Sequence, residues 1–248
     1  MAQKDFLNAR IEDAAVKAEK MGVAVYVDFY EPQLQHIIER EIGRYPSCDC
    51  EFFGGHEYCE RKMLAVFPKG QAPSYGDYPI DCIHIKIKNT DISHPDVLGS
   101  LLGLGLQRGK TGDINLIDGV AQLFVQVPLG EFVENNLCKI SKYDVIAKRV
   151  SVADVISVEP LFTSVSVIIP SMRIDAVIHS VYKLSRSEAS NFVKSEKVYI
   201  NHVVCTKPGA AVKTGDVVSV RSKGKFIVDE IAGSTKKGNI KLAVRKFV

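Results

Sequence analysis

No apolar run in this sequence approaches the roughly 18 residues that a helix needs to cross a bilayer. Cysteine is also scarce, because six in 248 residues is far below the density of a small disulfide scaffold, and no secretory leader is evident. These absences argue against a helical membrane protein and against a secreted, disulfide-stapled one. We therefore expect a soluble cytoplasmic protein whose thiols are reduced.

Complete phosphate-binding and cofactor loops are missing as well. Gly109-Lys110-Thr111 resembles the end of a nucleotide-binding P-loop, but Leu104 occupies the position of its first glycine. Gly103-Leu104-Gly105 lacks the third glycine of a dinucleotide fingerprint, and the segment before it has helical spacing. His179 and His202 have no nucleophile or carboxylate at a recognisable spacing. The sequence therefore predicts neither a cofactor nor a catalytic residue.

The amino-terminal part of the sequence contains a cluster of Cys and His residues that could form a metal site. Cys48, Cys50, His56 and Cys59 supply four possible zinc ligands within twelve residues. One residue separates the first two cysteines, whereas zinc sites usually place two to four there. We expect no bound metal, and zinc is the alternative that metal analysis would detect.

Positive charge is concentrated toward the carboxyl end. Residues 171–248 hold fifteen Lys and Arg against six Asp and Glu, a net +9, whereas residues 1–170 hold seventeen against twenty-three, a net −6. Short β-branched runs such as Val198-Tyr199-Ile200 and Val217-Val218-Ser219-Val220 indicate a folded domain and not a basic tail. The basic segment is thus predicted to bind a polyanion, and the acidic remainder to contact protein or to orient the basic domain.

The length and the spacing of apolar residues predict an α+β protein of three domains. Residues 1–75 are expected to form a small α+β domain with helices over 6–21 and 32–43 and a hairpin over 51–53 and 63–67. The prolines and glycines of residues 68–79 indicate a linker. Residues 76–168 are expected to form a middle domain, and residues 171–248 the basic domain.

The middle domain alternates in the order βαββαβ. Strands are predicted over 82–87, 114–117, 121–127 and 144–150, and helices over 95–102 and 129–137. Asp118-Gly119 predicts a tight hairpin between the two central strands. The order is that of ferredoxin-like and RNA-recognition-motif-like (RRM-like) domains. Because the strands lack the aromatic side chains on which such sheets stack bases, we expect a scaffold and not an RNA-reading surface.

The basic domain opens with two predicted helices. The first covers residues 173–182. The second starts after Ser185, whose hydroxyl is placed to cap it, and Glu188 three residues later completes a capping box. This helix is expected to end near Lys194, and short strands beginning at Val198 follow.

Several spaced motifs of this domain are similar to the S-four, or αL, RNA-binding domain. They are Arg173-Ile174-Asp175, Ser185-Arg186-Ser187-Glu188-Ala189, Val198-Tyr199-Ile200-Asn201 and Gly215-Asp216-Val217-Val218-Ser219-Val220-Arg221. The resemblance implies binding of structured RNA, and by itself no particular activity. The chain departs from the pattern at Asn239, where a more Arg-rich ending is expected, and at Lys225, where Arg is usual.

The middle domain resembles one family in particular. The segment from His94 to Gly105, followed by Gly112-Asp113-Ile114, looks like the YlmH family, so the two resemblances together span nearly the whole chain. Membership would imply a factor that binds rRNA and tRNA on the large ribosomal subunit carrying stalled peptidyl-tRNA, in ribosome-associated quality control. It would also imply an association with Gram-positive cell division.

Phosphate groups of the RNA are the expected ligands of the basic domain. The helix that starts at Arg186 offers amide N–H groups and the positive end of its dipole, and hydroxyl donors stand beside it. Arg173 could fork onto a neighbouring phosphate, whereas Asn201 is a turn residue first and an RNA contact second. Such contacts read the shape of RNA and give no DNA specificity. The predicted RNA-binding residues are Arg173, Ser185, Arg186, Ser187, Lys194, Lys197, Asn201, Lys207, Lys236 and Lys237.

A non-enzymatic RNA-binding protein is the function that the sequence favours. The first alternative is an RNA-modifying enzyme, but the Gly-Arg-Leu-Asp context of a pseudouridine synthase and the glycine-rich cofactor loop of an rRNA methyltransferase are both missing. The second is an interaction scaffold for cell division. For that scaffold, charge reversal at Arg173 and Arg186 should leave function intact.

Overall fold

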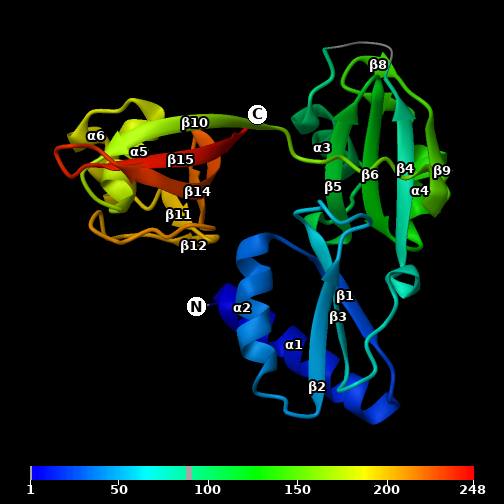
Figure 1. Cartoon of the computed structure of the whole chain (residues 1–248). Coiled ribbons are helices and arrows are strands. Elements are labelled where there is room, and N and C mark those ends of the chain that lie inside the picture. Colours follow the sequence, from blue (N-terminus) through cyan, green and yellow to red (C-terminus); the bar gives the residue numbers. More distant parts are fainter. Residues whose placement is uncertain (1, 88–90) are drawn as a thin grey trace. The chain divides into compact units, whose positions relative to one another are not determined.

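The chain divides into two compact units, Met1–Val158 and Glu159–Val248. They are seen in a computed structural model that describes residues 2–87 and 91–248 (Figure 1). Within these ranges no helix is long and apolar enough to cross a membrane. The further boundary that the sequence places between residues 75 and 76 stays a prediction.

The first unit opens with two helices and a three-stranded sheet. The elements are α1 (Ala2–Met21), β1 (Val25–Tyr30), α2 (Pro32–Ile42), β2 (Cys48–Phe53) and β3 (Lys62–Pro68). The antiparallel sheet has the order β1-β3-β2. Ile11 of α1 and Ile38 of α2 pack with Leu64 and Val66 of β3 in one buried cluster. Both helices and the β2–β3 pairing agree with the sequence, whereas β1 was not predicted.

The rest of the first unit confirms the βαββαβ order. Its elements are β4 (Ile80–Lys86), α3 (His94–Gly103), β5 (Thr111–Ile117), β6 (Val120–Gln126), α4 (Leu129–Asn136), β7 (Lys139–Ile140), β8 (Tyr143–Asp144) and β9 (Ala147–Val150), with short 3-10 turns η1 (Tyr75–Asp77), η2 (Arg108–Lys110) and η3 (Val152–Asp154). The main sheet has the order β5-β6-β4-β9 and is antiparallel throughout. Asp118 and Gly119 both have positive φ, as the hairpin turn that they predict requires.

One face of this sheet is covered by other parts of the same unit. Phe124 and Cys82 pack with Met63 and Phe29 of the amino-terminal sheet. Further along, Gln122 is fully buried and exchanges two hydrogen bonds of 2.8 Å with the backbone of Ile156. RRM-like domains stack bases on this face. Its coverage agrees with the expectation that the sheet is a scaffold.

The buried side chain of Arg61 joins the two parts of the first unit. Its Nε donates to the Thr111 carbonyl (3.1 Å), and its Nη1 donates to Glu31 Oε1 (2.9 Å). Its Nη2 donates to the carbonyls of Phe29 (3.2 Å) and Arg108 (3.0 Å). Arg61 is 7% exposed, and this burial lowers the pKa of its guanidinium. The ion pair with Glu31 and the hydrogen bonds to these carbonyls therefore hold β1 against the start of β5.

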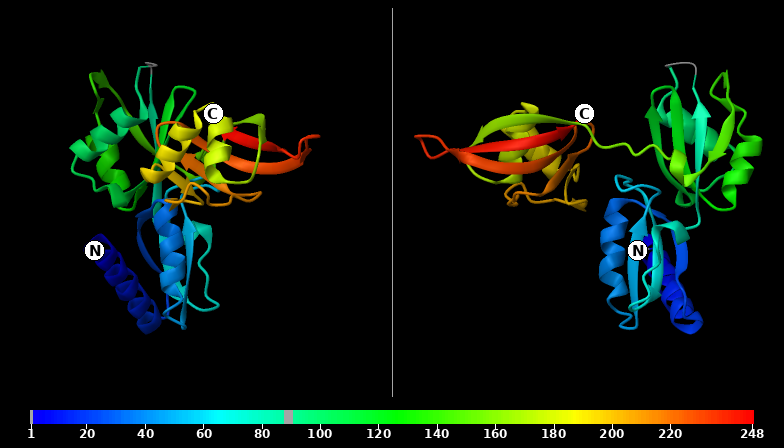
Figure 2. Two further views of the ribbon diagram at one scale, coloured as in Figure 1. Left: turned by 90° about the vertical axis from the view of Figure 1, so that its left-hand side faces the viewer. Right: turned by 45° about the vertical axis from the view of Figure 1, so that its right-hand side comes forward.

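The second unit is a six-stranded sheet with two helices. It comprises β10 (Phe162–Ile169), α5 (Ile174–Tyr182), α6 (Arg186–Lys194), β11 (Val198–Ile200), β12 (Val203–Val204), β13 (Val217–Val220), β14 (Gly224–Ser234) and β15 (Ile240–Phe247). The sheet order is β10-β15-β14-β13-β11-β12. Ile178 of α5 and Val193 of α6 share one buried core with Val218, Phe226 and Val244, and Figure 2 shows both helices on one side of the sheet.

The edge strand β10 was not predicted. It pairs along its whole length with β15, from Phe162 opposite Phe247 to Ile169 opposite Ile240. It precedes Ser171, at which the sequence starts the basic domain. The two predicted helices of that domain are present, and α6 ends at Lys194 as expected.

Candidate nucleic-acid interface

The start of α6 carries the capping box that its sequence predicts. The backbone N–H of Glu188 donates to Ser185 Oγ (3.2 Å), and the Ser185 N–H donates to Glu188 Oε2 (2.8 Å). Hydrogen bonds from the side chain and the backbone N–H of Ser185 lower the pKa of Glu188, so its carboxylate is ionised at the helix N-terminus. Ser187 Oγ lies 3.1 Å from Ser185 Oγ, which places the two hydroxyls together. A phosphate here would meet hydroxyl protons and the side chain of Arg186, beside a fixed carboxylate.

Arg173 lies directly before α5 and is held by Asp175. Its Nε and Nη2 donate to Asp175 Oδ1 (3.0 Å) and Oδ2 (2.6 Å), and Oδ1 also accepts the N–H of Ala176 (2.8 Å). The paired contact lowers the pKa of Asp175 and raises that of Arg173. Arginine has five N–H donors, so three stay available on a side chain that is 54% exposed. The guanidinium is therefore oriented and still able to bind a phosphate.

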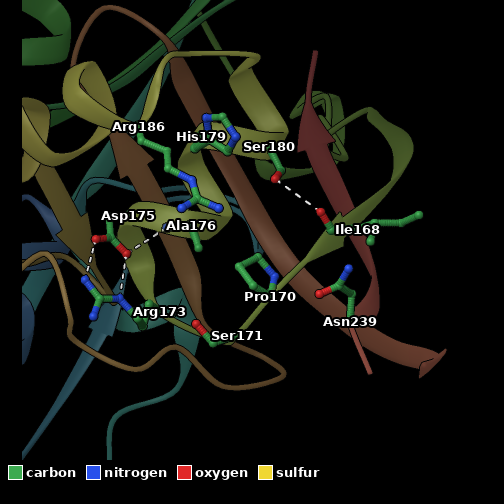
Figure 3. A pocket seen from close by; sticks show the side chains of 10 residues that line it. All are labelled: Ile168, Pro170, Ser171, Arg173, Asp175, Ala176, His179, Ser180, Arg186 and Asn239. Carbon is green, nitrogen blue, oxygen red and sulfur yellow. Dashed lines mark hydrogen bonds and ion pairs between the residues drawn. The ribbon is translucent and has the colours of Figure 1, made fainter. Parts of the chain in front are cut away.

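A hollow of about 500 Å³ brings the two predicted arginines together (Figure 3). Arg173 and Asp175 border it from the start of α5, and Arg186 from the start of α6. Figure 3 shows the Arg186 side chain reaching into this hollow near His179. The other lining residues are Ile168, Pro170, Ser171, Ala176, Ser180 and Asn239.

Arg186 differs from Arg173 in having no carboxylate partner. Among residues 2–87 and 91–248, none forms a hydrogen bond or ion pair with its guanidinium. His179 has its Nδ1 against the carbonyl of Leu184; since a carbonyl only accepts, Nδ1 carries the proton and Nε2 is left for other contacts. The hollow therefore contains one arginine that is paired with a carboxylate but keeps free donors, and one whose whole guanidinium can pair with an anion.

The predicted lysines lie at three other places. Lys194 is in the last turn of α6, and Lys197 follows it, with its ammonium 5.8 Å from the centre of the Phe192 ring. Lys236 and Lys237 are exposed in the turn between β14 and β15, next to Asn239 of the hollow. The exposed Lys207 lies in the loop after β12.

That loop packs beside Arg173. The N–H of Asp175 donates to the carbonyl of Pro208 (3.2 Å), and Gly209 lies close enough that a Cβ there would be 3.5 Å from Arg173 Nη1. Lys207, the residue before Pro208, is thus on the same side of the unit as the hollow. Lys194 and Lys197 belong to the opposite end of α6.

Both polar atoms of the Asn201 side chain form hydrogen bonds within the protein. Its Nδ2 donates to Asp216 Oδ1 (2.8 Å), and its Oδ1 accepts the N–H of Val217 (2.9 Å). Its φ is +47°, in the left-handed region that asparagine tolerates better than most residues. The role as a turn residue is therefore clear in the structure, and the RNA contact stays a prediction.

Sequence reasoning missed His179 and Ser180 as lining residues, and it named Asn239 only as a departure from the family pattern. A helical-face argument could have found the first two, because residues 179 and 180 follow residues 175 and 176, respectively, by four positions and share one side of α5 with them. Asn239 could not have been found in this way, because it reaches the hollow through the pairing of β15 with β10.

The four possible zinc ligands lie in different surroundings. Cys48 packs in the buried cluster formed by α1 and α2, whereas Cys59 packs in the cluster around Phe124. His56 Nδ1 accepts the N–H of Tyr58 (3.3 Å). Over residues 2–87 and 91–248, no group of three or more His, Cys, Asp or Glu is placed to hold a metal ion.

Comparisons with known proteins point to RNA. Residues 73–154 match the domain family described as "Putative RNA-binding domain in YlmH", and residues 172–218 match the S4 domain. The chain is 29% identical over 241 residues to the "Ribosome-associated protein quality control protein P2" of Bacillus subtilis (strain 168), covering 95% of this chain and 91% of that protein. The solved cell division protein ylmH from Streptococcus pneumoniae superposes with a TM-score of 0.54 at 16% identity, over 63% of this chain and 96% of that one. That structure shows likeness of fold alone.

Proposed function

We propose that this chain, which matches the YlmH RNA-binding domain and the S4 domain, is an RNA-binding protein of the YlmH family and binds rRNA and tRNA on the large ribosomal subunit in ribosome-associated quality control. In this proposal it acts in the cytoplasm as a non-enzymatic factor that recognises stalled peptidyl-tRNA. The quality-control role rests on the name of the Bacillus subtilis relative.

The observation that supports RNA contact most strongly is the Arg186 guanidinium, with which no residue in the described part of the chain pairs, in a hollow beside the oriented Arg173. A phosphate placed there would accept two parallel N–H bonds from Arg186 and further bonds from the free donors of Arg173. The hydroxyls of Ser185 and Ser187 stand at the same helix start. The Asp175 carboxylate holds Arg173 in one orientation before RNA arrives, which reduces the entropy lost on binding.

The lysines near the hollow would contact the RNA backbone on either side of the phosphate bound there. Lys207 lies on the loop that packs beside Arg173, and Lys236 and Lys237 lie on the turn next to Asn239. Ammonium groups on flexible stems contact phosphates as point charges without reading bases. The ligand would therefore be recognised by the shape of its sugar-phosphate backbone, as is usual for folded RNA.

Salt dependence tests this proposal. Binding of the full chain to isolated large subunits should weaken linearly on a plot of log affinity against log salt concentration, because each phosphate contact releases counterions. The Arg186→Ala variant should show a slope smaller by about one. Affinity that does not change with salt would contradict binding through phosphates.

A further inference from the structure

The sheet of the second unit has one face that its own helices leave uncovered. Val165 of β10 and Val244 of β15 pack in the core between the sheet and the two helices. Because successive side chains of a strand alternate between its two faces, Phe162 and Phe247 point the other way. Among residues 159–248, all of which the structure describes, the helices lie on one side of the sheet only (Figure 2). The opposite face is therefore not covered by a helix of this unit.

Two rings and two cations cluster on this uncovered face. Phe162 pairs with Phe247 across β10 and β15, and their ring centroids are 4.7 Å apart. The Cζ atom of Arg245 lies 5.1 Å from the centre of the Phe162 ring, and the Nζ atom of Lys225 lies 4.2 Å from the centre of the Phe247 ring. Each cation is attracted by the face of its ring. The sheet thus presents aromatic surface and positive charge at the same place.

Tyr199 adds a third ring to this face. It lies on β11 between Val198, which is buried in the core, and Ile200, which packs against the core, so its ring points to the uncovered face. Tyr199 pairs with Ser219, and Ser219 pairs with Lys225 on the next strand. Because neighbouring strands are about 4.8 Å apart, the backbones of Tyr199 and Lys225 are roughly 10 Å apart. We call five half-buried residues of this face the open face: Phe162, Tyr199, Lys225, Arg245 and Phe247.

The guanidinium of Arg245 is oriented before any ligand binds. Its Nε donates to Asp229 Oδ1 (3.0 Å), and its other side chain contact is with the ring of Phe162. The side chain is 41% exposed, and within residues 2–87 and 91–248 its four Nη N–H groups donate to no residue. Unpaired bases stack on guanidinium planes as well as on aromatic rings. Arg245 therefore offers an oriented planar cation against which a base can stack.

The charges around the open face are mainly positive. The cations are Lys225, Lys241 and Arg245 on the strands, and Arg221 and Lys223 in the exposed turn between β13 and β14. The carboxylates are Asp229, which pairs with Arg245, and Glu230, which lies opposite Ala243 at a bulge of β14. This excess of cations attracts a polyanion.

We propose that the open face binds an unpaired segment of RNA. Its bases stack on the three rings and on the Arg245 guanidinium, and its phosphates lie beside Lys225 and the turn that carries Lys223. None of the five residues is among those predicted to bind RNA, so this is a second contact, separate from the hollow around Arg186. The choice of RNA as the source of the bases rests on the proposed function.

Three other occupants fit less well. Paired RNA keeps the faces of its bases inside the helical stack, so it offers phosphates to the cations and no partner to the rings. An acidic protein segment has the same shortcoming. An apolar protein segment would cover the rings, but it would also bury the charges of Lys225 and Arg245 without supplying an anion. An unpaired nucleotide supplies both a planar group and a negative charge.

The test compares two labelled probes on the full chain by fluorescence anisotropy. One is hexaadenylate RNA, and the other is an abasic hexamer with the same ribose-phosphate backbone and charge. We expect hexaadenylate to bind at least about fivefold more tightly, because only its bases can stack. Tyr199→Ala and Arg245→Ala should each remove most of this preference, whereas Tyr199→Phe keeps the ring and should keep the preference.

The controls separate stacking from folding and from charge. Phe132→Ala removes a 41% exposed ring of the first unit and should leave the preference unchanged. Arg245→Lys keeps the charge and loses the planar group, so it should lower the preference. Circular dichroism shows whether each variant is folded, and the exposed position of Arg245 makes Arg245→Lys the deciding variant if Tyr199→Ala does not fold.

Several outcomes would overturn this inference. Equal binding of the two hexamers would mean that phosphates alone are bound. A preference that persists in folded Tyr199→Ala and Arg245→Lys would place the bases elsewhere. Displacement of hexaadenylate by an equal concentration of hexaglutamate would identify an acidic protein segment as the better ligand.

Failure of this inference and failure of the proposed function are distinguishable. Arg186→Glu changes the hollow and not the open face, so it should weaken binding to large subunits while the preference for hexaadenylate over the abasic hexamer persists. If that preference were absent and large-subunit binding still depended on Arg186, only this inference would fail. Binding to large subunits that does not change with salt would contradict the proposed function, whatever the two hexamers show.

Discussion

Reversing the charge at Arg186 is expected to weaken the binding of structured RNA about a hundredfold. Arg186 has no protein partner among the residues that the structure describes, so its guanidinium is free to pair with a phosphate. Arg186→Glu removes that pairing and places a second carboxylate beside Glu188, which already caps the helix. Repulsion then adds to the lost contact. The measurement is the dissociation constant of the full chain on large subunits at fixed salt.

The matched control is Lys17→Glu, which makes the same change of net charge at an exposed position of α1. It should change RNA affinity less than about twofold, because the site is in the other unit. Arg186→Lys keeps the charge and loses the planar fork, so an intermediate loss is expected. Equal effects of Arg186→Glu and Lys17→Glu would show that net charge, and not this hollow, governs binding.

Replacing Arg61 with alanine is expected to destabilise the first unit by about 3 kcal/mol. The change removes one donor from each of the carbonyls of Thr111, Phe29 and Arg108, although the Thr111 and Arg108 carbonyls keep bonds from Arg108 Nη1 and Thr111 Oγ1. It also leaves Arg108 beside an empty space, and burial already lowers the pKa of Arg108 to about 10. Hydrogen exchange followed by mass spectrometry should show faster exchange in peptides from β1 and β5 and unchanged exchange in the second unit.

The control for this prediction is Arg44→Ala. Arg44 pairs with Glu41 (2.7 Å), but its side chain is 66% exposed, and exposed pairs contribute little to stability. Its loss should change the stability by less than about 0.5 kcal/mol. If Arg61→Ala had an equally small effect, the carbonyl groups around Arg61 would have to find other partners, and its role in joining the two parts of the unit would be wrong.

Local signals in the sequence were sufficient for the helices and their caps. Ser185 and Glu188 specify the start of α6 because both partners of the capping box lie within four residues. Asp118-Gly119 specified the β5–β6 turn for the same reason. The α+β class and the βαββαβ order follow from such signals, and the sheet order β5-β6-β4-β9 confirms them.

Long-range pairing could not be predicted in this way. Strand β10 has no partner within seventy residues of the chain, since it pairs with β15, and β1 pairs with β3 across α2 and β2. The hollow around Arg186 depends on that same β10–β15 pairing, so of its lining residues only Arg173, Asp175 and Arg186 belong to the motifs found in the sequence. The buried Arg61 resembles any surface arginine in sequence, because its partners are backbone carbonyls from distant segments.

Ultraviolet crosslinking of the full chain to large ribosomal subunits, with the crosslinked peptides identified by mass spectrometry, tests the central claim most directly. The account predicts crosslinks in the peptides that border the hollow, residues 171–187 and 235–239, and their loss in Arg186→Glu. Crosslinks confined to Met1–Val158 would contradict it, because RNA would then be held by the first unit and not by the capped helix and its arginines.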